Sequence, residues 1–347
     1  MLSKGRVIVA AASLAAIAAT FVLVLPRIAD YGAVWRVLHT LSWPWLCGLT
    51  GVTVLNLATF PLPWVAALTG LGYVNELRMT MASTAFSLVV PGGAPVGMAA
   101  SFAMLRAWGL DGAAVTRAVA LTGVFNQLST FVFPVVAVLL LAVEGTVSMG
   151  LELVALLGLG VAVAVAAALA SGLARDRFAR AIGDRAAVLA SRLSRLRRRG
   201  AVTWDGTAFV RFRSESLTLL RERWLALSVT TLVNQLVGFL LLELSLRAFG
   251  ITRAQVPVAA SFAAWSIGRV LASLPLTPGG IGAVEIGLTT SLIGFGGPNA
   301  KVVAAVLVYR AASIAPTVVA GLLAAATWRL QQPLGSPVRH EDPNTLR

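Results

Sequence analysis

Charged residues are scarce in this chain. Asp, Glu, Lys and Arg make up 12% of its 347 residues, whereas a soluble domain carries about 25%. Hydrophobic residues make up 58%, and the mean hydropathy is +0.84. So little polar surface cannot cover a water-soluble domain of this size. The composition therefore predicts an integral membrane protein.

Cysteine and histidine are nearly absent as well. The single cysteine, Cys47, excludes an intramolecular disulfide and a cysteine-based metal cluster. His39 and His340 lie far apart in sequence, which argues against a histidine metal site. The chain contains no G-x-S-x-G, P-loop or H-E-x-x-H pattern and no paired-carboxylate acid/base set. We therefore expect no metal, no cofactor and no enzymatic activity.

The chain instead contains several long uncharged runs. A helix of roughly 20 apolar residues crosses about 30 Å of hydrocarbon. Runs of this kind place spanning helices at about 7–25, 43–69, 115–142, 149–172, 224–246 and 302–328. The first run is longer than the apolar core of a signal peptide and lacks a small-residue cleavage site, so we expect it to be retained. The expected fold is all-α, with about six spanning helices.

The positive charge is concentrated in a few places and predicts the topology. Of the residues from 175 to 223, thirteen are arginines and five are acidic, in a chain of net charge +14. Basic loops face the cytoplasm, and the N-terminus (Lys4, Arg6) and the end after Arg329 are basic too. An even number of spans puts all three on one side. We expect a multi-pass protein of the cell membrane with cytoplasmic termini, a cytoplasmic loop at 175–223 and a disordered tail at 330–347.

The basic loop itself allows two interpretations. Its apolar residues recur at helical spacing: Phe178, Ile182, Leu189, Leu193 and Leu196. This pattern fits an amphipathic helix on the inner leaflet, where each basic residue contributes about 1 kcal/mol. It fits equally a solvated linker whose charge only sets topology. We expect no nucleic-acid partner.

Two Pro-Gly-Gly breaks interrupt apolar regions, at Pro91-Gly92-Gly93 and at Pro278-Gly279-Gly280. Proline removes a backbone donor and glycine often adopts positive φ, so neither continues a helix well. The uncharged arm before the first break, 79–90, is only about 18 Å long. This predicts a re-entrant hairpin of two half-helices. The arm before the second break, 255–276, is long enough to cross, so the second hairpin is either re-entrant or a pair of spans.

The two breaks also suggest an internal repeat. Three spans separate them, so the hairpins enter from opposite faces, as in the inverted repeats that build midplane sites in transporters. Repeat 1 would cover about 43–142 and repeat 2 about 224–328, within a single membrane domain. The alternative is that these glycines only allow close helix packing.

Three charged residues lie in strongly apolar surroundings: Arg269, Glu285 and Arg310. A central charge costs about 2.5–3.5 kcal/mol by insertion scales, which favours mutual pairing around a polar cavity with Glu285 between the arginines. One arginine would then be partly free to bind a phosphate. The planar guanidinium group of arginine can donate two parallel hydrogen bonds to phosphate oxygens. The half-helix that begins after Pro278 adds free N–H groups. The alternative is a buried ion pair that only fixes helix register.

The predicted substrate site lies between the two hairpins. Its residues are Arg269, Glu285, Arg310, Thr277, Pro278, Gly279 and Gly280, with Pro91, Gly92 and Gly93 from the first break. Two amide pairs, Asn126-Gln127 and Asn234-Gln235, lie within predicted spans. We expect them to form interhelical hydrogen bonds, worth about 0.6 kcal/mol each.

The second break also carries a family resemblance. Residues 274–282 read Leu-Pro-Leu-Thr-Pro-Gly-Gly-Ile-Gly and are followed by Glu285. This pattern resembles the flippase-like transmembrane region of lysylphosphatidylglycerol synthases, and the resemblance extends over about 10–330. At the first break the family often has a Gly-Glu pair, where this chain has Gly97-Met98. The soluble aminoacyl-transferase domain of full-length synthases is absent from this sequence. The resemblance therefore implies lipid movement or lipid-carrier handling rather than aminoacyl transfer.

The leading functional hypothesis is a lipid flippase or transporter. Its partners would be membrane lipids: an anionic or lysyl-modified phospholipid, or a lipid-linked sugar. A second hypothesis is a non-transporting scaffold subunit that binds a glycosyltransferase or cell-envelope enzyme through the basic loop. A third is a proton-coupled small-solute transporter that uses Glu285.

Overall fold

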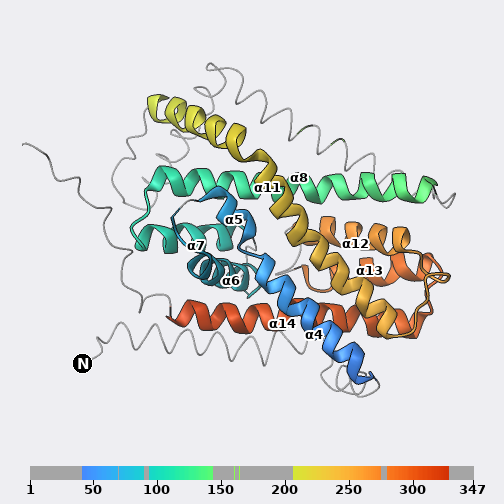
Figure 1. The fold of residues 1–347 in the computed structure, drawn as a ribbon. Helices are drawn as coiled ribbons and strands as arrows, with labels where there is room; N and C mark the ends of the chain where they lie inside the picture. The colour runs from blue at the N-terminus through green and yellow to red at the C-terminus, as the bar shows by residue number, and fades with distance from the viewer. Residues whose placement is uncertain are drawn as a thin grey trace, which may run out of the picture.

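The computed structural model describes residues 41–68, 70–89, 94–143, 160, 164, 206–274 and 280–327. The elements formed in these ranges are all α-helices, labelled as in Figure 1. They are α4 (Trp43–Thr59), α5 (Leu62–Ala67), α6 (Tyr73–Val89), α7 (Ala94–Ala107), α8 (Gly112–Val143), α11 (Gly206–Ala248), α12 (Val258–Ser273), α13 (Ala283–Gly294) and α14 (Asn299–Thr327). The all-α membrane fold expected from composition is confirmed.

Four helical segments are long and apolar enough to cross a membrane. They are Trp43–Ala67, Gly112–Val143, Ser214–Ala248 and Asn299–Thr327, and they coincide with four of the six predicted spans. The other two, at 7–25 and 149–172, lie outside the described residues, as do most of the basic loop and the tail. Helix α11 begins at Gly206, so the last part of the segment predicted as a loop is helical.

The remaining helices form two pairs that are too short to span. Helices α6 and α7 have 17 and 14 residues, and α12 and α13 have 16 and 12. At 1.5 Å per residue they reach about 18–26 Å, below the roughly 30 Å of a hydrocarbon core. Each pair is joined by one of the two Pro-Gly-Gly breaks. Residues 91–93 and 278–279 of these breaks lie outside the described residues, whereas Gly280 is described.

The helices before the two breaks differ in extent from the apolar runs of the sequence. Helix α6 begins at Tyr73, ahead of the uncharged arm 79–90, because the charged residues of its first turns do not interrupt it. The run 255–276 was expected to be long enough to cross, but α12 occupies only Val258–Ser273. Leu274 follows in an extended conformation (φ −79°, ψ 132°), as expected for a residue before a proline.

The first helix pair packs at one end of the bundle. One apolar cluster joins Met79 of α6 and Leu105 of α7 to Val115 and Ala118, both in the first turns of α8. Ala324, near the end of α14, packs against the same cluster. The α6–α7 pair therefore lies where α8 begins and α14 ends.

The second pair packs at the opposite end. Its cluster includes Trp265 of α12, Leu288 of α13, Ala137 and Leu141 of late α8, and Val302 and Ala305 of early α14. Helices α8 and α14 are consequently antiparallel, with one short pair at each end, while α4 and α11 run obliquely across them (Figure 1).

Helices α6 and α14 approach each other closely at Gly321. A Cβ atom placed on this glycine would lie 2.2 Å from the Met81 carbonyl oxygen and 2.6 Å from the Ala85 Cβ atom. Only glycine fits at such a distance, as at small-residue helix crossings in other membrane proteins.

We predict that Gly321→Ala separates α6 from α14 and destabilises the protein by about 1–3 kcal/mol. A thermal melt in detergent micelles measures this as a lower Tm. The matched control is Gly51→Ala in α4, where a Cβ atom meets nothing within 4 Å. Equal melting temperatures for the two variants would contradict the close contact.

Candidate functional site

An ion pair joins α13 to the middle of α14. The Arg310 Nε–H donates to Glu285 Oε1 at 2.6 Å, and the two side chains are 9% and 15% exposed. Glu285 is the third residue of α13, and its Oε2 accepts the Gly282 N–H at 2.6 Å. Gly282 precedes the helix with φ 86°, a conformation that glycine adopts without strain. The carboxylate thus caps its own helix and neutralises a buried arginine.

Arg269 of α12 has a different environment. Its Nη2 donates to Asn126 Oδ1 and to Thr130 Oγ1 of α8, both at 3.3 Å. Its Nε is buried without a hydrogen-bond partner, and its guanidinium carbon lies 5.9 Å from the centre of the Trp265 ring. Within the described part of the chain, Arg269 forms no ion pair.

These contacts correct one part of the predicted arrangement. Glu285 was expected to lie between Arg269 and Arg310, but it pairs with Arg310 alone. The physical reason is that Glu285 is tied to the start of its own helix, facing α14, while Arg269 leaves α12 toward α8. Arg269 is therefore bound through neutral oxygen atoms, without a carboxylate among its described partners.

The expected interhelical hydrogen bonds of the amide residues are present. The Gln235 Nε2–H of α11 donates to Asn126 Oδ1 of α8 at 2.7 Å. The Thr59 hydroxyl at the end of α4 donates to Asn234 Oδ1 at 3.2 Å. Asn126 Oδ1 thus accepts hydrogen bonds from both Gln235 and Arg269, which joins three helices at one carbonyl oxygen.

Residues that flank the two breaks meet at the middle of α14. Leu88 and Val89, just before the first break, pack on a cluster that includes Ile314 and Val318. Ile281, just after the second break, packs on the same cluster. Both breaks therefore adjoin one region of the bundle, one helical turn from Arg310.

Of the predicted site residues, the structure places Arg269, Gly280, Glu285 and Arg310. Gly280 is buried with φ 68°, and a Cβ atom there would lie 3.1 Å from the Ala272 Cα atom. The others, Thr277, Pro278 and Gly279 and the first-break residues Pro91, Gly92 and Gly93, lie outside the described residues.

Sequence reasoning passed over two buried acidic residues. Glu243 of α11 accepts hydrogen bonds from Arg247 at 2.7 Å and from the Ser261 hydroxyl at 2.6 Å. The Glu-x-x-x-Arg spacing signals this pair in the sequence. Glu76 of α6 is 1% exposed, and its Oε2 has no hydrogen-bond partner. No sequence pattern identifies Glu76 as buried, because the polar and charged residues beside it are typical of an exposed helix end.

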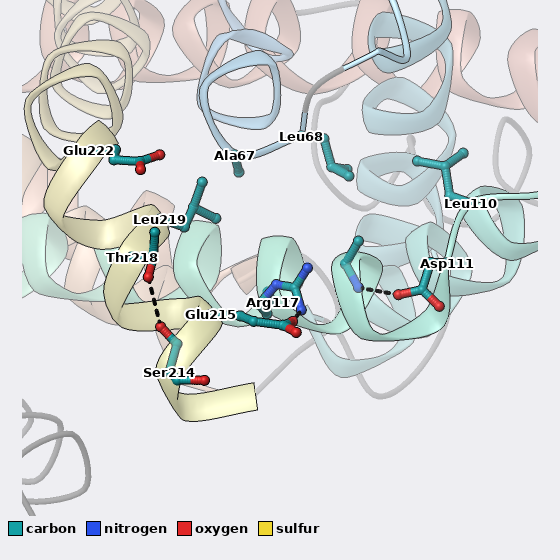
Figure 2. Close-up of a pocket in the computed structure, with 11 residues that line it drawn as sticks. Ala67, Leu68, Leu110, Asp111, Arg117, Ser214, Glu215, Thr218, Leu219 and Glu222 are labelled. Carbon is teal, nitrogen blue, oxygen red and sulfur yellow. Dashed lines mark hydrogen bonds and ion pairs between the residues drawn. The ribbon is translucent and has the colours of Figure 1, made fainter. Parts of the chain in front are cut away.

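An open cavity of about 530 Å³ lies elsewhere, between α5, the start of α8 and α11 (Figure 2). An ion pair between Arg117 and Glu215 crosses it, and Asp111 and Glu222 also line it. The Ala114 amide, together with that of Ala113 and the charges of Arg106 and Arg117, lowers the pKa of Asp111. None of the four predicted site residues that the structure describes lines this cavity.

Comparison with known proteins agrees with these findings. Residues 8–321 match the family model of the lysylphosphatidylglycerol synthase TM region. A search among curated proteins found no match. The family match covers both short helix pairs, the first three described spans and most of the fourth, and it confirms the resemblance seen in the pattern at 274–285.

We predict that Arg310→Met destabilises the protein by about 3–5 kcal/mol, because it leaves the Glu285 carboxylate buried without its cation. The double variant Glu285→Met/Arg310→Met should recover much of this loss, since two apolar side chains need no counter-charge. Thermal melts in detergent micelles test both. Arg253→Met, at an exposed arginine, is the control. A double variant that is no more stable than the single one would contradict a charge-balancing role.

Proposed function

The chain belongs to the family of the lysylphosphatidylglycerol synthase transmembrane region, and on that premise we propose that it is a flippase-like lipid transporter without enzymatic activity. It is a multi-pass membrane protein of a family concerned with lipid metabolism or transport. The proposed cargo is a phospholipid or a lipid-linked sugar, moved between leaflets. The proposed location is the cell membrane, with both termini and the basic loop in the cytoplasm.

The observation that carries the proposal is the environment of Arg269. Its guanidinium lies among apolar helices, with amide and hydroxyl oxygens as partners and no carboxylate among them. A charge in such a place costs about 2.5–3.5 kcal/mol by insertion scales. A lipid phosphate would supply the missing counter-charge and would bind the guanidinium through two parallel hydrogen bonds.

The paired arginine has a different role in this proposal. Arg310 is neutralised by Glu285 and links α13 to α14. We assign the phosphate to Arg269, and we assign to the Glu285–Arg310 pair the positioning of the helix that follows the second break. A cationic headgroup, such as a lysyl group, would meet Glu285 at the same level of the bundle.

The arrangement of the helices supports alternating access. One short pair packs where α8 begins and the other where α8 ends. In addition, α6 packs on α14 and α12 packs on α8, so each pair contacts the long helix of the other half. This is the relation expected of an inverted repeat, and alternating access in such proteins moves one half against the other.

We predict that Arg269→Gln slows lipid flipping about tenfold or more, because it removes a charge-assisted hydrogen bond worth about 1.5–3 kcal/mol. The assay is the movement of fluorescent phosphatidylglycerol, lysyl-phosphatidylglycerol or a phosphate-linked lipid sugar in proteoliposomes. Arg253→Gln, which removes an exposed arginine, should leave the rate unchanged.

Two outcomes would count against the proposal. Equal flipping rates for the wild type and Arg269→Gln would remove the phosphate role of Arg269. No movement of any of these lipids by the wild type would favour the other hypotheses. Flux of a solute under a pH gradient would then indicate a solute transporter, and loss of a bound envelope enzyme on deletion of 178–199 would indicate a scaffold subunit.

A further inference from the structure

Glu76 is a buried carboxyl group that the proposed lipid site does not use. It lies in the first turn of α6, is 1% exposed and ranks among the largest fully buried side chains. Its Oε2 has no hydrogen-bond partner, and no described hydrogen bond or ion pair reaches its carboxyl group. Two other described acidic side chains with little exposure are both engaged: Glu285 with Arg310 and Glu243 with Arg247.

The described residues that flank Glu76 belong to an apolar cluster. Leu71 and Met79, on either side of it in sequence, belong to a buried cluster with Leu105 and Trp108 of the α7 end. The part of α14 that faces α6, residues 314–327, contains no charged side chain.

Four charged groups at this end of the bundle have other partners. Arg106 of α7 donates to the Leu110 carbonyl oxygen, and Arg223 of α11 donates to that of Ala66. Arg117 of α8 pairs with Glu215, and Asp111 accepts amide hydrogen bonds. On α6 itself, Arg78 is exposed. Within the described ranges, no cation is therefore bound to the Glu76 carboxyl group.

An ionised carboxylate without a partner is too costly in such an interior, and the group instead holds a proton. We propose that Glu76 is a proton-binding site, which holds its proton while the α6–α7 pair is packed on α14 and releases it to water when the pair separates. This inference rests on the proposed function, in which one half of the molecule moves against the other. It makes lipid movement respond to a proton gradient, with one proton taken up and released at Glu76 in each cycle.

The same geometry argues that Glu285 is not the proton site. Glu285 accepts one hydrogen bond from the Arg310 guanidinium and one from the Gly282 amide. Both of its oxygen atoms are therefore engaged within the bundle. The proton-coupled role that the sequence suggested for Glu285 is therefore better assigned to Glu76.

The first test detects the proton directly. Infrared difference spectra of the purified protein are recorded between about pH 6 and about pH 9, where exposed carboxyl groups are already ionised. We expect a band of a protonated carboxyl group that disappears at the higher pH. It should be absent from Glu76→Gln and retained in Glu222→Gln, which changes an exposed glutamate of α11.

A Glu76→Gln spectrum that keeps the wild-type band would overturn the proposal, and so would a wild type without such a band. Should the glutamine variant fail to fold, Glu76→Met replaces the carboxyl group by an apolar side chain of similar length. The same loss of the band is expected from it. This test does not depend on lipid transport.

The second test measures coupling. In proteoliposomes with fluorescent phosphatidylglycerol, an imposed pH gradient should change the wild-type flipping rate several-fold. Glu76→Gln should flip lipid at a rate that does not change with the gradient, whereas Glu222→Gln should respond like the wild type. A full response from Glu76→Gln would overturn the coupling. If the wild type flips no lipid at any pH, the proposed function fails, and the infrared band alone decides whether Glu76 binds a proton.

Discussion

A charged side chain costs several kcal/mol in an apolar interior, and this structure offsets that cost in three different ways. Glu285 and Arg310 neutralise each other across two helices. Arg269 is held by an amide oxygen and a hydroxyl oxygen beside the Trp265 ring. The Glu76 carboxyl group has no partner among the described residues, so on our inference it avoids the cost by remaining uncharged. These three solutions give the three groups different chemistry, since only Arg269 keeps a charge that a ligand can still neutralise.

The apolar packing determines where these groups can act. The two long antiparallel helices α8 and α14 each carry a short pair at one end, and each pair also contacts the long helix of the other half. The end of α6 and a residue just before α13 consequently lie next to one region of α14. Helix ends have unpaired backbone groups. A bundle built in this way brings polar backbone and charged side chains together at a depth where each would be unstable alone.

Much of this architecture could be predicted from the sequence, and the reasons differ by element. The four described spans follow from uninterrupted apolar runs, and the short helices follow from proline and glycine, which act locally. For Asn126, the sequence predicted a hydrogen bond to another helix but not the residue that forms it. An amide side chain within a span indicates that a hydrogen bond is required, but it does not identify the partner.

The arrangement of Arg269, Glu285 and Arg310 was predicted less well. The pairing of Glu285 with one arginine rather than two depends on the direction in which α13 leaves Gly282, and this direction is a three-dimensional property. Glu76 was missed for a similar reason. In the sequence it resembles a solvated helix start, and only the packing of α7 and α14 over it reveals its burial.

The two contacts that α14 makes with the short pairs differ in kind. Its contact with α13 includes a 2.6 Å ion pair with a fixed direction, whereas its contact with α6 is formed around Gly321 by small and apolar side chains. Movement of α13 along α14 would break the directional ion pair. Movement of α6 along α14 would instead exchange one set of apolar contacts for another. The contact between α13 and α14 should therefore resist sliding more than the contact between α6 and α14. The two halves differ in this respect even though their helices are arranged alike.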